Sequence, residues 1–147
     1  MTVASLNGRL MGQNAVTGEL ESNGIDISQP CVDATITVGA EAANVRAITI
    51  QLKDCTGADI AYAETVEIHM FADAARAAYV TTGGSTGIEI GTDGALLDVV
   101  AKKLFVAVSE TDGDLDLTWT DTGTEAAYLG LRLPNGRMIM SDALTNS

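Results

Sequence analysis

Apolar and polar residues alternate along much of the chain after about residue 30. In residues 45–53 (VRAITIQLK), isoleucine and leucine fall on one face of an extended chain, and threonine, glutamine and lysine fall on the other. Residues 33–38 (DATITV) and 65–71 (TVEIHMF) alternate in the same way. A period of two with one polar face predicts antiparallel strands that cover a core on one side and face water on the other.

Three dipeptides that favour tight turns separate the apolar runs of the second half: Asp93-Gly94, Asp112-Gly113 and Asn135-Gly136. Both central positions of a type I′ turn need positive φ, which Asn and Asp tolerate and Gly adopts freely. We therefore expect three hairpins. They would pair residues 87–90 with 95–100, 104–109 with 114–120, and 127–133 with 137–141.

The middle hairpin would bring the apolar residues of both of its strands onto one face. These residues are Leu104, Val106, Val108, Leu115, Leu117 and Trp119. The alternate residues of the second strand, including Asp114 and Asp116, would then face water. A slip of the register by one residue would bury these aspartates, which disfavours it.

Two segments fit more than one structure. Residues 72–78 (ADAARAA) could form one helical turn or a loop, and residues 96–104 (LLDVVAKKL) fit a helical stripe as well as a strand. The β-branched Val99 and Val100 favour the strand. Many short strands with Gly-containing turns predict an all-β fold, an antiparallel β-sandwich of seven to nine strands, immunoglobulin-like or jelly-roll-like, with a small barrel as the alternative.

Residues 1–30 differ from the rest, because glycines recur and apolar residues follow no sustained period. They predict an extended N-terminal arm before a β-sandwich domain at 31–147, with short strands within residues 18–27 as an alternative. An arm without its own core needs buried surface from a partner, and otherwise remains a disordered tail. The candidate partner-binding residues of the arm are Leu6, Leu10, Met11, Val16 and Leu20. Phe71 and Tyr128, which face outward in the predicted register, are secondary candidates.

The charge of the chain excludes one class of partner. With 8 basic and 20 acidic residues, its formal net charge is −12. Nucleic-acid binders cluster Lys and Arg, so we expect no nucleic-acid partner and attribute the acidity to solubility. No run approaches the roughly 18 apolar residues of a membrane span, and the first residues lack a signal-peptide pattern. We expect no membrane association and synthesis in the cytoplasm.

Candidate catalytic and metal-binding residues are few. His69 has no nucleophile or carboxylate at a motif spacing, and the acidic set Asp112, Asp114, Asp116 and Asp121 lacks the Gly and Glu positions of an EF-hand loop. Residues 83–87 (GGSTG) lack the Lys of a phosphate-binding loop. Cys31 and Cys55 are too few for a disulfide scaffold. We therefore expect no enzyme, no cofactor and no metal, and two reduced thiols.

The run from about 31 to 143 resembles a group of small β proteins encoded among the structural genes of tailed bacteriophages. The resemblance lies in the order of its features. These are an isoleucine-rich strand with an Asp-containing turn (VDATITVGAEAANVRAITIQLKDCTGADI), the segment TVEIHMF, a TDG turn (IGTDGALLDVV), the SETDGDLDL hairpin and a closing YLGLRLPNGRMIMS hairpin.

This resemblance implies a head decoration, or cement, protein that binds the outer surface of the capsid after synthesis in the host bacterium. Its partners would be the major capsid protein and further copies of itself, with a trimer favoured. A tail-associated or head-fibre module of the virion is the first alternative. A cell-surface carbohydrate-binding module is the second, although the chain lacks a clear aromatic platform.

Overall fold

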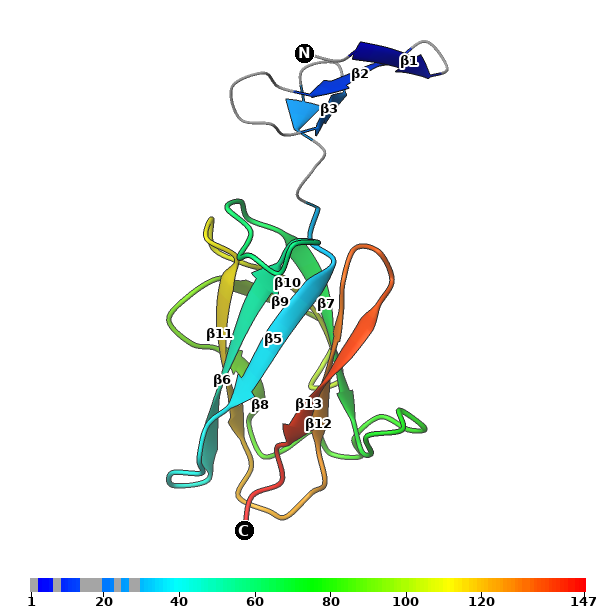
Figure 1. The fold of residues 1–147 in the computed structure, drawn as a ribbon. Coiled ribbons are helices and arrows are strands. Elements are labelled where there is room, and N and C mark those ends of the chain that lie inside the picture. The colour runs from blue at the N-terminus through cyan, green and yellow to red at the C-terminus, as the bar shows by residue number, and fades with distance from the viewer. Residues whose placement is uncertain (1–2, 7–8, 14–19, 23–24, 27–29) are drawn as a thin grey trace. The chain divides into compact units, whose positions relative to one another are not determined.

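The computed structural model describes residues 3–6, 9–13, 20–22, 25–26 and 30–147 (Figure 1). The chain divides into two compact units, residues 1–30 and residues 31–147. The described residues contain no helix of the length and apolarity that a membrane crossing requires.

The described residues of the first unit form four short strands. They are β1 (Val3–Leu6), β2 (Arg9–Gln13), β3 (Leu20–Ser22) and β4 (Ile25–Asp26). The strands pair antiparallel in chain order, with Val3 opposite Gly12 and Met11 opposite Ser22. The arm predicted from the sequence therefore contains paired strands, and β3 and β4 fall within the segment for which strands were the alternative.

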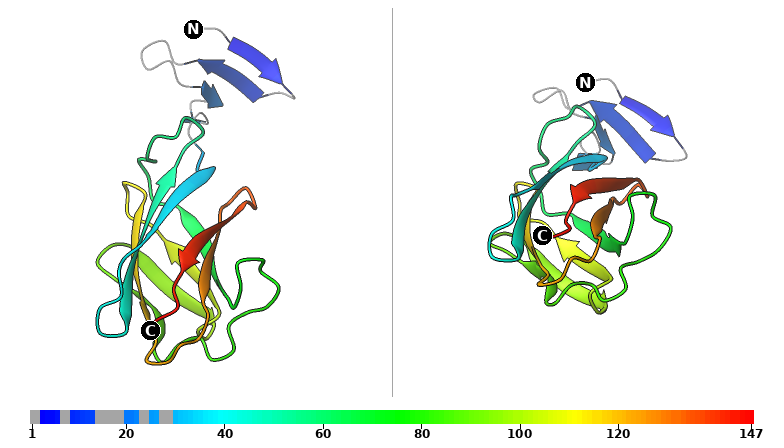
Figure 2. Two further views of the ribbon diagram at one scale, coloured as in Figure 1. Left: turned by 60° about the horizontal axis from the view of Figure 1, so that its bottom comes forward. Right: turned by 90° about the horizontal axis from the view of Figure 1, so that it is seen from below.

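The second unit is an antiparallel β-sandwich of nine strands, as predicted. The strands are β5 (Asp33–Val38), β6 (Val45–Lys53), β7 (Thr65–Phe71), β8 (Gly87–Ile90), β9 (Ala95–Val100), β10 (Leu104–Val108), β11 (Asp114–Thr120), β12 (Tyr128–Arg132) and β13 (Met138–Ala143). One sheet, which we call the β6 sheet, has the order β5-β6-β11-β8. The other, the β7 sheet, has the order β13-β12-β7-β10-β9, and Figure 2 shows the two layers.

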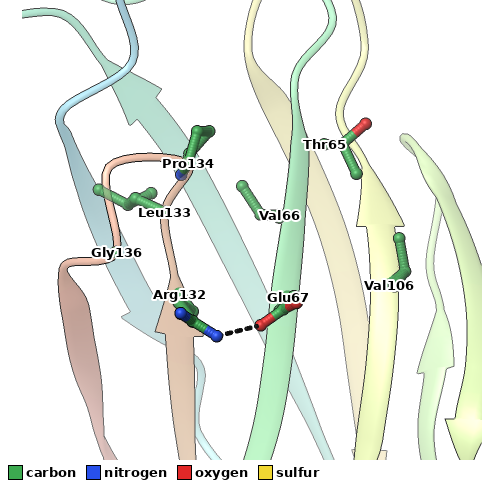
Figure 3. Close-up of a pocket in the computed structure, with 8 residues that line it drawn as sticks. All are labelled: Thr65, Val66, Glu67, Val106, Arg132, Leu133, Pro134 and Gly136. Carbon is green, nitrogen blue, oxygen red and sulfur yellow. Dashed lines mark hydrogen bonds and ion pairs between the residues drawn. The ribbon is translucent and has the colours of Figure 1, made fainter.

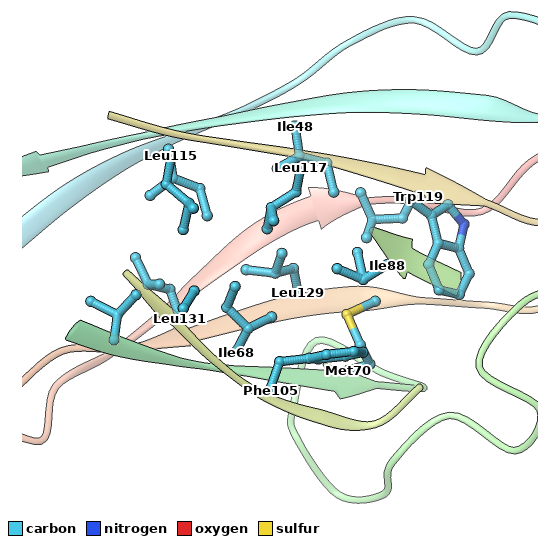
Figure 4. Close-up of a cluster of buried hydrophobic side chains, with 14 of the residues drawn as sticks. Ile48, Ile68, Met70, Ile88, Phe105, Leu115, Leu117, Trp119, Leu129 and Leu131 are labelled. Atoms are coloured by element: carbon cyan, nitrogen blue, oxygen red, sulfur yellow. The ribbon is translucent and has the colours of Figure 1, made fainter. Parts of the chain in front are cut away.

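The core lies between the sheets and is built by the alternation seen in the sequence. Every second residue is buried in β7 and β11, and in β6 from Ile48 onward, and Trp119 is the largest fully buried side chain (Figure 4). The predicted inward faces of these three strands are confirmed. The residues of these faces are Ile48, Ile50, Leu52, Val66, Ile68, Met70, Leu115, Leu117 and Trp119.

Two of the three predicted hairpins are wrong. The turn at Asn135-Gly136 does join β12 to β13. The turns at Asp93-Gly94 and Asp112-Gly113, however, each carry the chain from one sheet to the other: β8 pairs with β11, and β10 pairs with β7 and β9. The glycines have positive φ as expected, but Asp93, Asp112 and Asn135 do not, so none of the three turns is type I′. A tight turn also does not determine whether the next strand pairs with the previous one or faces it across the core.

The predicted orientation of β10 is also wrong. Phe105 and Ala107 point into the core, whereas Leu104, Val106 and Val108 lie on the outer face of the β7 sheet. The error follows from the wrong hairpin. A strand that pairs beside β11 would share its inward face, but β10 lies in the opposite sheet, and its inward residues are the alternate ones.

Two hairpins form at turns that contain no Asn-Gly or Asp-Gly dipeptide. Ala43 and Asn44, with φ of 52° and 67°, make the two-residue turn between β5 and β6. Residues 101–103 connect β9 to β10, and Lys102 has a φ of 61°. Residues 72–78 form a loop, and residues 95–100 form a strand, which was the favoured structure for this segment.

The two sides of the sandwich differ. On one side, the edge strands β5 and β13 pack beside each other, and Arg137 bridges them by an ion pair with Asp33 (3.1 Å) and a hydrogen bond to the Val32 carbonyl. On the other side, β8 and β9 are the last strands of their sheets, and no further strand of the unit covers them. The unit thus has one closed side and one open side.

Candidate functional site

Exposed apolar side chains gather on the open side of the sandwich. The structure gives seven exposed large apolar or tyrosine side chains among the described residues, and five of them lie on β8, β9 and β10. We call these five the β9 surface. They are Ile90 (39% exposed), Leu97 (66%), Val99 (55%), Val100 (49%) and Val108 (38%). They do not all share one face: Leu97, Val100 and Val108 point outward from the β7 sheet, whereas Ile90 lies opposite the inward-facing Leu117 at the rim of the core. Apolar exposure concentrated along one open edge is a feature of interaction surfaces.

The position of β9 explains why these residues are exposed. Leu97 lies opposite Val106, and Val100 lies opposite Leu104, so all of them share the outer face of the β7 sheet. The register between β9 and β10 shifts at Val99, which leaves Val99 and Val100 both exposed. Leu96 instead points inward and packs against the core. The strand is therefore apolar on both faces, although only one of them is covered.

A groove of about 390 Å³ runs between β8 and β9. Its apolar lining comes from both sheets and includes Ile88, Leu96 and Phe105, while Glu89 and Asp98 add negative charge. Lys102 also lines the groove, but its Nζ donates to the carbonyls of residues 84 and 85 at 3.1 and 2.8 Å. The groove offers an apolar base and polar edges, and no side chain in it is arranged as a nucleophile beside a base.

A second depression, of about 290 Å³, lies beside the β12–β13 hairpin (Figure 3). Val66, Val106 and Pro134 supply apolar surface, and Arg132 forms an ion pair with Glu67 at 3.2 Å. Because the two charged groups pair with each other, this depression presents little uncompensated charge.

His69 belongs to a stacked aromatic group on the outer face of the β7 sheet. Its ring stacks on Phe71, with centroids 5.8 Å apart, and Phe71 stacks on Tyr79 at 5.1 Å. The His69 Nδ1 lies 2.9 Å from the Tyr79 hydroxyl, and Nε2 lies 3.4 Å from Glu67. Both ring nitrogens therefore have partners within the domain, which fits a structural role for this histidine.

The expected exposure of Phe71 is wrong. Phe71 faces away from the core as predicted, but it is only 7% exposed because Tyr79 and the outer face of β12 cover its ring. Tyr128, its opposite residue on β12, is half-buried. The sequence alternation gives the face of a strand, but not the loop that folds over it.

The structure brings together only part of the acidic set. Asp114 and Asp116 on β11 meet Asp93 of the β8–β9 connection, with one carboxylate oxygen of each within 4.8 Å of the others. Burial, followed by the nearby charge of Asp116, raises the pKa of Asp114, and its Oδ1 is buried without a hydrogen-bond partner. Asp121 lies elsewhere, where it accepts hydrogen bonds from the N–H groups of residues 85 and 123.

Glu125 lies in the connection between β11 and β12, and its carboxylate binds the glycine-containing loop that follows β7. Its carboxylate accepts hydrogen bonds from the backbone N–H groups of residues 81, 82, 83 and 84 and from the Thr82 hydroxyl. Burial alone would raise the pKa of Glu125, but these donors lower it to about 2. The N–H groups that could have held an anion therefore already hold a carboxylate of the domain.

The remaining predicted residues are placed as follows. Leu6 lies on β1, Leu10 and Met11 on β2 and Leu20 on β3, while their side chains and the whole of Val16 lie outside the described part of the chain. Cys31 is buried and Cys55 is exposed, and neither forms a disulfide. Burial and the charge of Glu64 raise the pKa of the Cys31 thiol to about 11, which keeps it protonated.

The β9 surface was not among the sites predicted from the sequence. The signal that could have found it is the pair of adjacent apolar doublets in residues 96–100 (LLDVV), which place apolar residues on both faces of a strand near a predicted turn.

Comparison with known proteins adds no relative: no protein-family model matches the sequence, and no curated protein shows significant similarity to it.

Proposed function

We propose that this chain is a structural protein of a bacteriophage virion that binds the outer surface of the capsid and reinforces it. The observation that supports this proposal most strongly is the β9 surface, an apolar cluster on a polar, strongly acidic β-sandwich. A rigid domain with one apolar side is suited to adhesion. The role requires no active site.

The identity of the proposed partner depends on sequence resemblance. Residues 31–143 resemble small β proteins of tailed bacteriophages in the order of their strands and turns, which favours the major capsid protein as the partner. The net charge of −12 supports binding to a protein shell rather than to the DNA that the shell encloses.

Binding would be multivalent. Each copy would contact more than one capsid subunit, and contacts between neighbouring copies would raise the effective concentration at the shell. Contacts of modest area then suffice for stable decoration. The strands of residues 1–30 would add a second contact, with Leu6, Leu10, Met11, Val16 and Leu20 as its candidate residues.

The proposal is tested by the copy number of the chain in purified particles, measured against the major capsid protein. A ratio of one to one, or another simple fraction set by capsid symmetry, is expected. A few copies per particle would instead favour a tail-associated or head-fibre module, and absence from particles would overturn the virion assignment.

A further inference from the structure

We propose that β9 is a self-association edge: β9 of one copy pairs antiparallel with β9 of a second copy, around a two-fold axis that lies between Leu97 of one copy and Leu97 of the other. The two β7 sheets would then join into one continuous sheet. This inference does not depend on the proposed function, because it concerns the purified chain alone.

The first observation is that β9 is an open edge. It is the last strand of the β7 sheet, so half of its backbone N–H and C=O groups have no partner strand. Natural proteins protect such edges with charged residues, Pro, bulges or a covering segment. Of these, Ala95–Val100 has the charge of Asp98 and the bulge at Val99, and it contains neither Lys nor Pro. Leu97 at its middle is the most exposed large apolar side chain of the described residues. Because both devices lie at Asp98 and Val99, the Ala95–Leu97 half of the edge is left as a template for another strand.

The geometry of antiparallel pairing restricts the register. Residues directly opposite each other point to the same face. A two-fold pair must therefore place one residue opposite its own copy, and we name the axis after that residue. An axis through Asp98 would place two aspartates opposite each other, which is unfavourable. An axis through Leu96 would shorten the overlap at the Gly94 end. The axis through Leu97 gives the longest overlap without opposed like charges.

In this register no two like charges lie opposite each other. Leu97 lies opposite Leu97 of the second copy on the outer face, and Ala95 lies opposite Val99. Leu96 lies opposite Asp98 on the inward face, where Asp98 is exposed at the margin of the groove. The register shift at Val99 falls at the end of the paired segment, so the pairing over the middle residues remains regular.

Charge complementarity favours a second copy as the occupant. Antiparallel pairing around Leu97 brings Ala101 of one copy opposite Asp93 of the other, so the basic turn that contains Lys102 and Lys103 approaches the start of the other β9. Asp93 belongs to the cluster with Asp114 and Asp116, which has no basic partner among the described residues. Neither lysine forms an ion pair with a carboxylate in the described part of the chain. The Lys102 Nζ is held by the carbonyls of residues 84 and 85 of its own copy, so Lys103 is the cation that each copy supplies to the other.

The pairing closes with two copies, because the same edge is used by both. It therefore predicts a dimer, in contrast to the trimer that the sequence resemblance favours. Antiparallel self-pairing also predicts a specific charge test. A substitution of Leu97 places two identical new side chains opposite each other across the axis.

The experiment is sedimentation equilibrium of the full chain and its variants at an ionic strength of about 0.15 M, where screening leaves short-range contacts intact. The wild type should be a monomer–dimer system. Leu97→Lys and Leu97→Asp should each raise the dimer dissociation constant at least roughly tenfold. An equimolar mixture of the two variants should recover dimers, because Lys then faces Asp. Met140→Lys, on β13 at the opposite edge of the same sheet, is the matched control and should leave the dimer unchanged.

Unfolding in urea confirms that each variant is folded before its association is interpreted. A wild type that stays monomeric at millimolar concentration, or forms trimers, would overturn the proposal. So would a dimer that Leu97→Lys leaves intact, or a mixture of the two Leu97 variants that fails to pair. None of these results affects the copy-number test on particles, so the two proposals fail independently.

Discussion

Phe71 lies across Gly130 on the outer face of the β7 sheet, and no side chain fits at position 130. A Cβ built on Gly130 would lie 2.7 Å from Cε2 of Phe71 and 3.0 Å from the Met138 sulfur. The glycine therefore lets the ring of Phe71 lie flat against β12. This contact, with the stacking of Tyr79, buries an aromatic side chain on a face that otherwise meets solvent.

Gly130→Ala should lower the free energy of unfolding by about 1–3 kcal/mol, because the added methyl group must displace Phe71 or Met138. Urea denaturation monitored by tryptophan fluorescence measures the change. The control is Gly123→Ala, where a Cβ would meet nothing closer than 3.4 Å. Equal stability of the two variants would mean that Phe71 packs less tightly than the structure indicates.

Glu125→Gln should lower the free energy of unfolding at neutral pH by roughly 1–3 kcal/mol, because the loop at residues 81–84 loses a charged acceptor. Hydrogen bonds from the loop lower the pKa of Glu125 to about 2, below the value of about 4.3 in an unfolded chain. Its contribution is therefore complete above about pH 4.3 and declines as the pH falls toward 2.

The measurement is the difference in unfolding free energy between wild type and Glu125→Gln as a function of pH. The difference should shrink on acidification through this window. Glu89→Gln changes an exposed glutamate and serves as the control. A difference that stays constant down to about pH 2 would show that the charge of Glu125 does not hold the loop.

Asp114→Asn should stabilise the domain at neutral pH by up to about 1 kcal/mol, a small effect because solvent screens this half-buried group. Burial and the charge of Asp116 raise the pKa of Asp114, so the fold favours its protonated form. The wild type thus loses stability as the pH rises through this pKa, and the variant does not. Thermal unfolding at pH 4 and pH 7, with the exposed Asp142→Asn as control, tests the sign. A variant less stable than wild type at pH 7 would contradict it.

Deletion of residues 1–30 should leave the β-sandwich folded and weaken attachment to capsids. The core of residues 31–147 is a compact unit of its own, which is why we expect the domain to fold without the first unit. Circular dichroism tests the fold, and co-sedimentation with capsids tests attachment. Unchanged binding after the deletion would remove Leu6, Leu10, Met11, Val16 and Leu20 from the proposed interface.

The inward faces of β6, β7 and β11 could be predicted because each strand has one buried and one polar face, and the period of two fixes which residues are inside. The hairpin at Asn135-Gly136 followed from its glycine-containing turn, although the turn is not of the predicted type I′. The same chemistry at Gly94 and Gly113 serves connections between the sheets, since positive φ at a glycine is needed for either kind of turn.

Other features depend on contacts that a local pattern does not contain. The β5–β6 turn places Ala43 at positive φ, a conformation that alanine seldom adopts, so the residue types at this turn do not predict it. Phe71 is covered by a residue eight positions later, and the β9 surface is exposed because no strand follows β9 at the edge of its sheet. A turn conformation, a covering loop and the order of the strands decided these three outcomes in turn.

The central claim, attachment to the capsid surface, is tested most directly by co-sedimentation of the purified full chain with capsids that lack it. Binding that saturates at a ratio to the major capsid protein set by capsid symmetry is the predicted result. A chain that stays in the supernatant at every concentration, while capsids pellet, would contradict the proposed function.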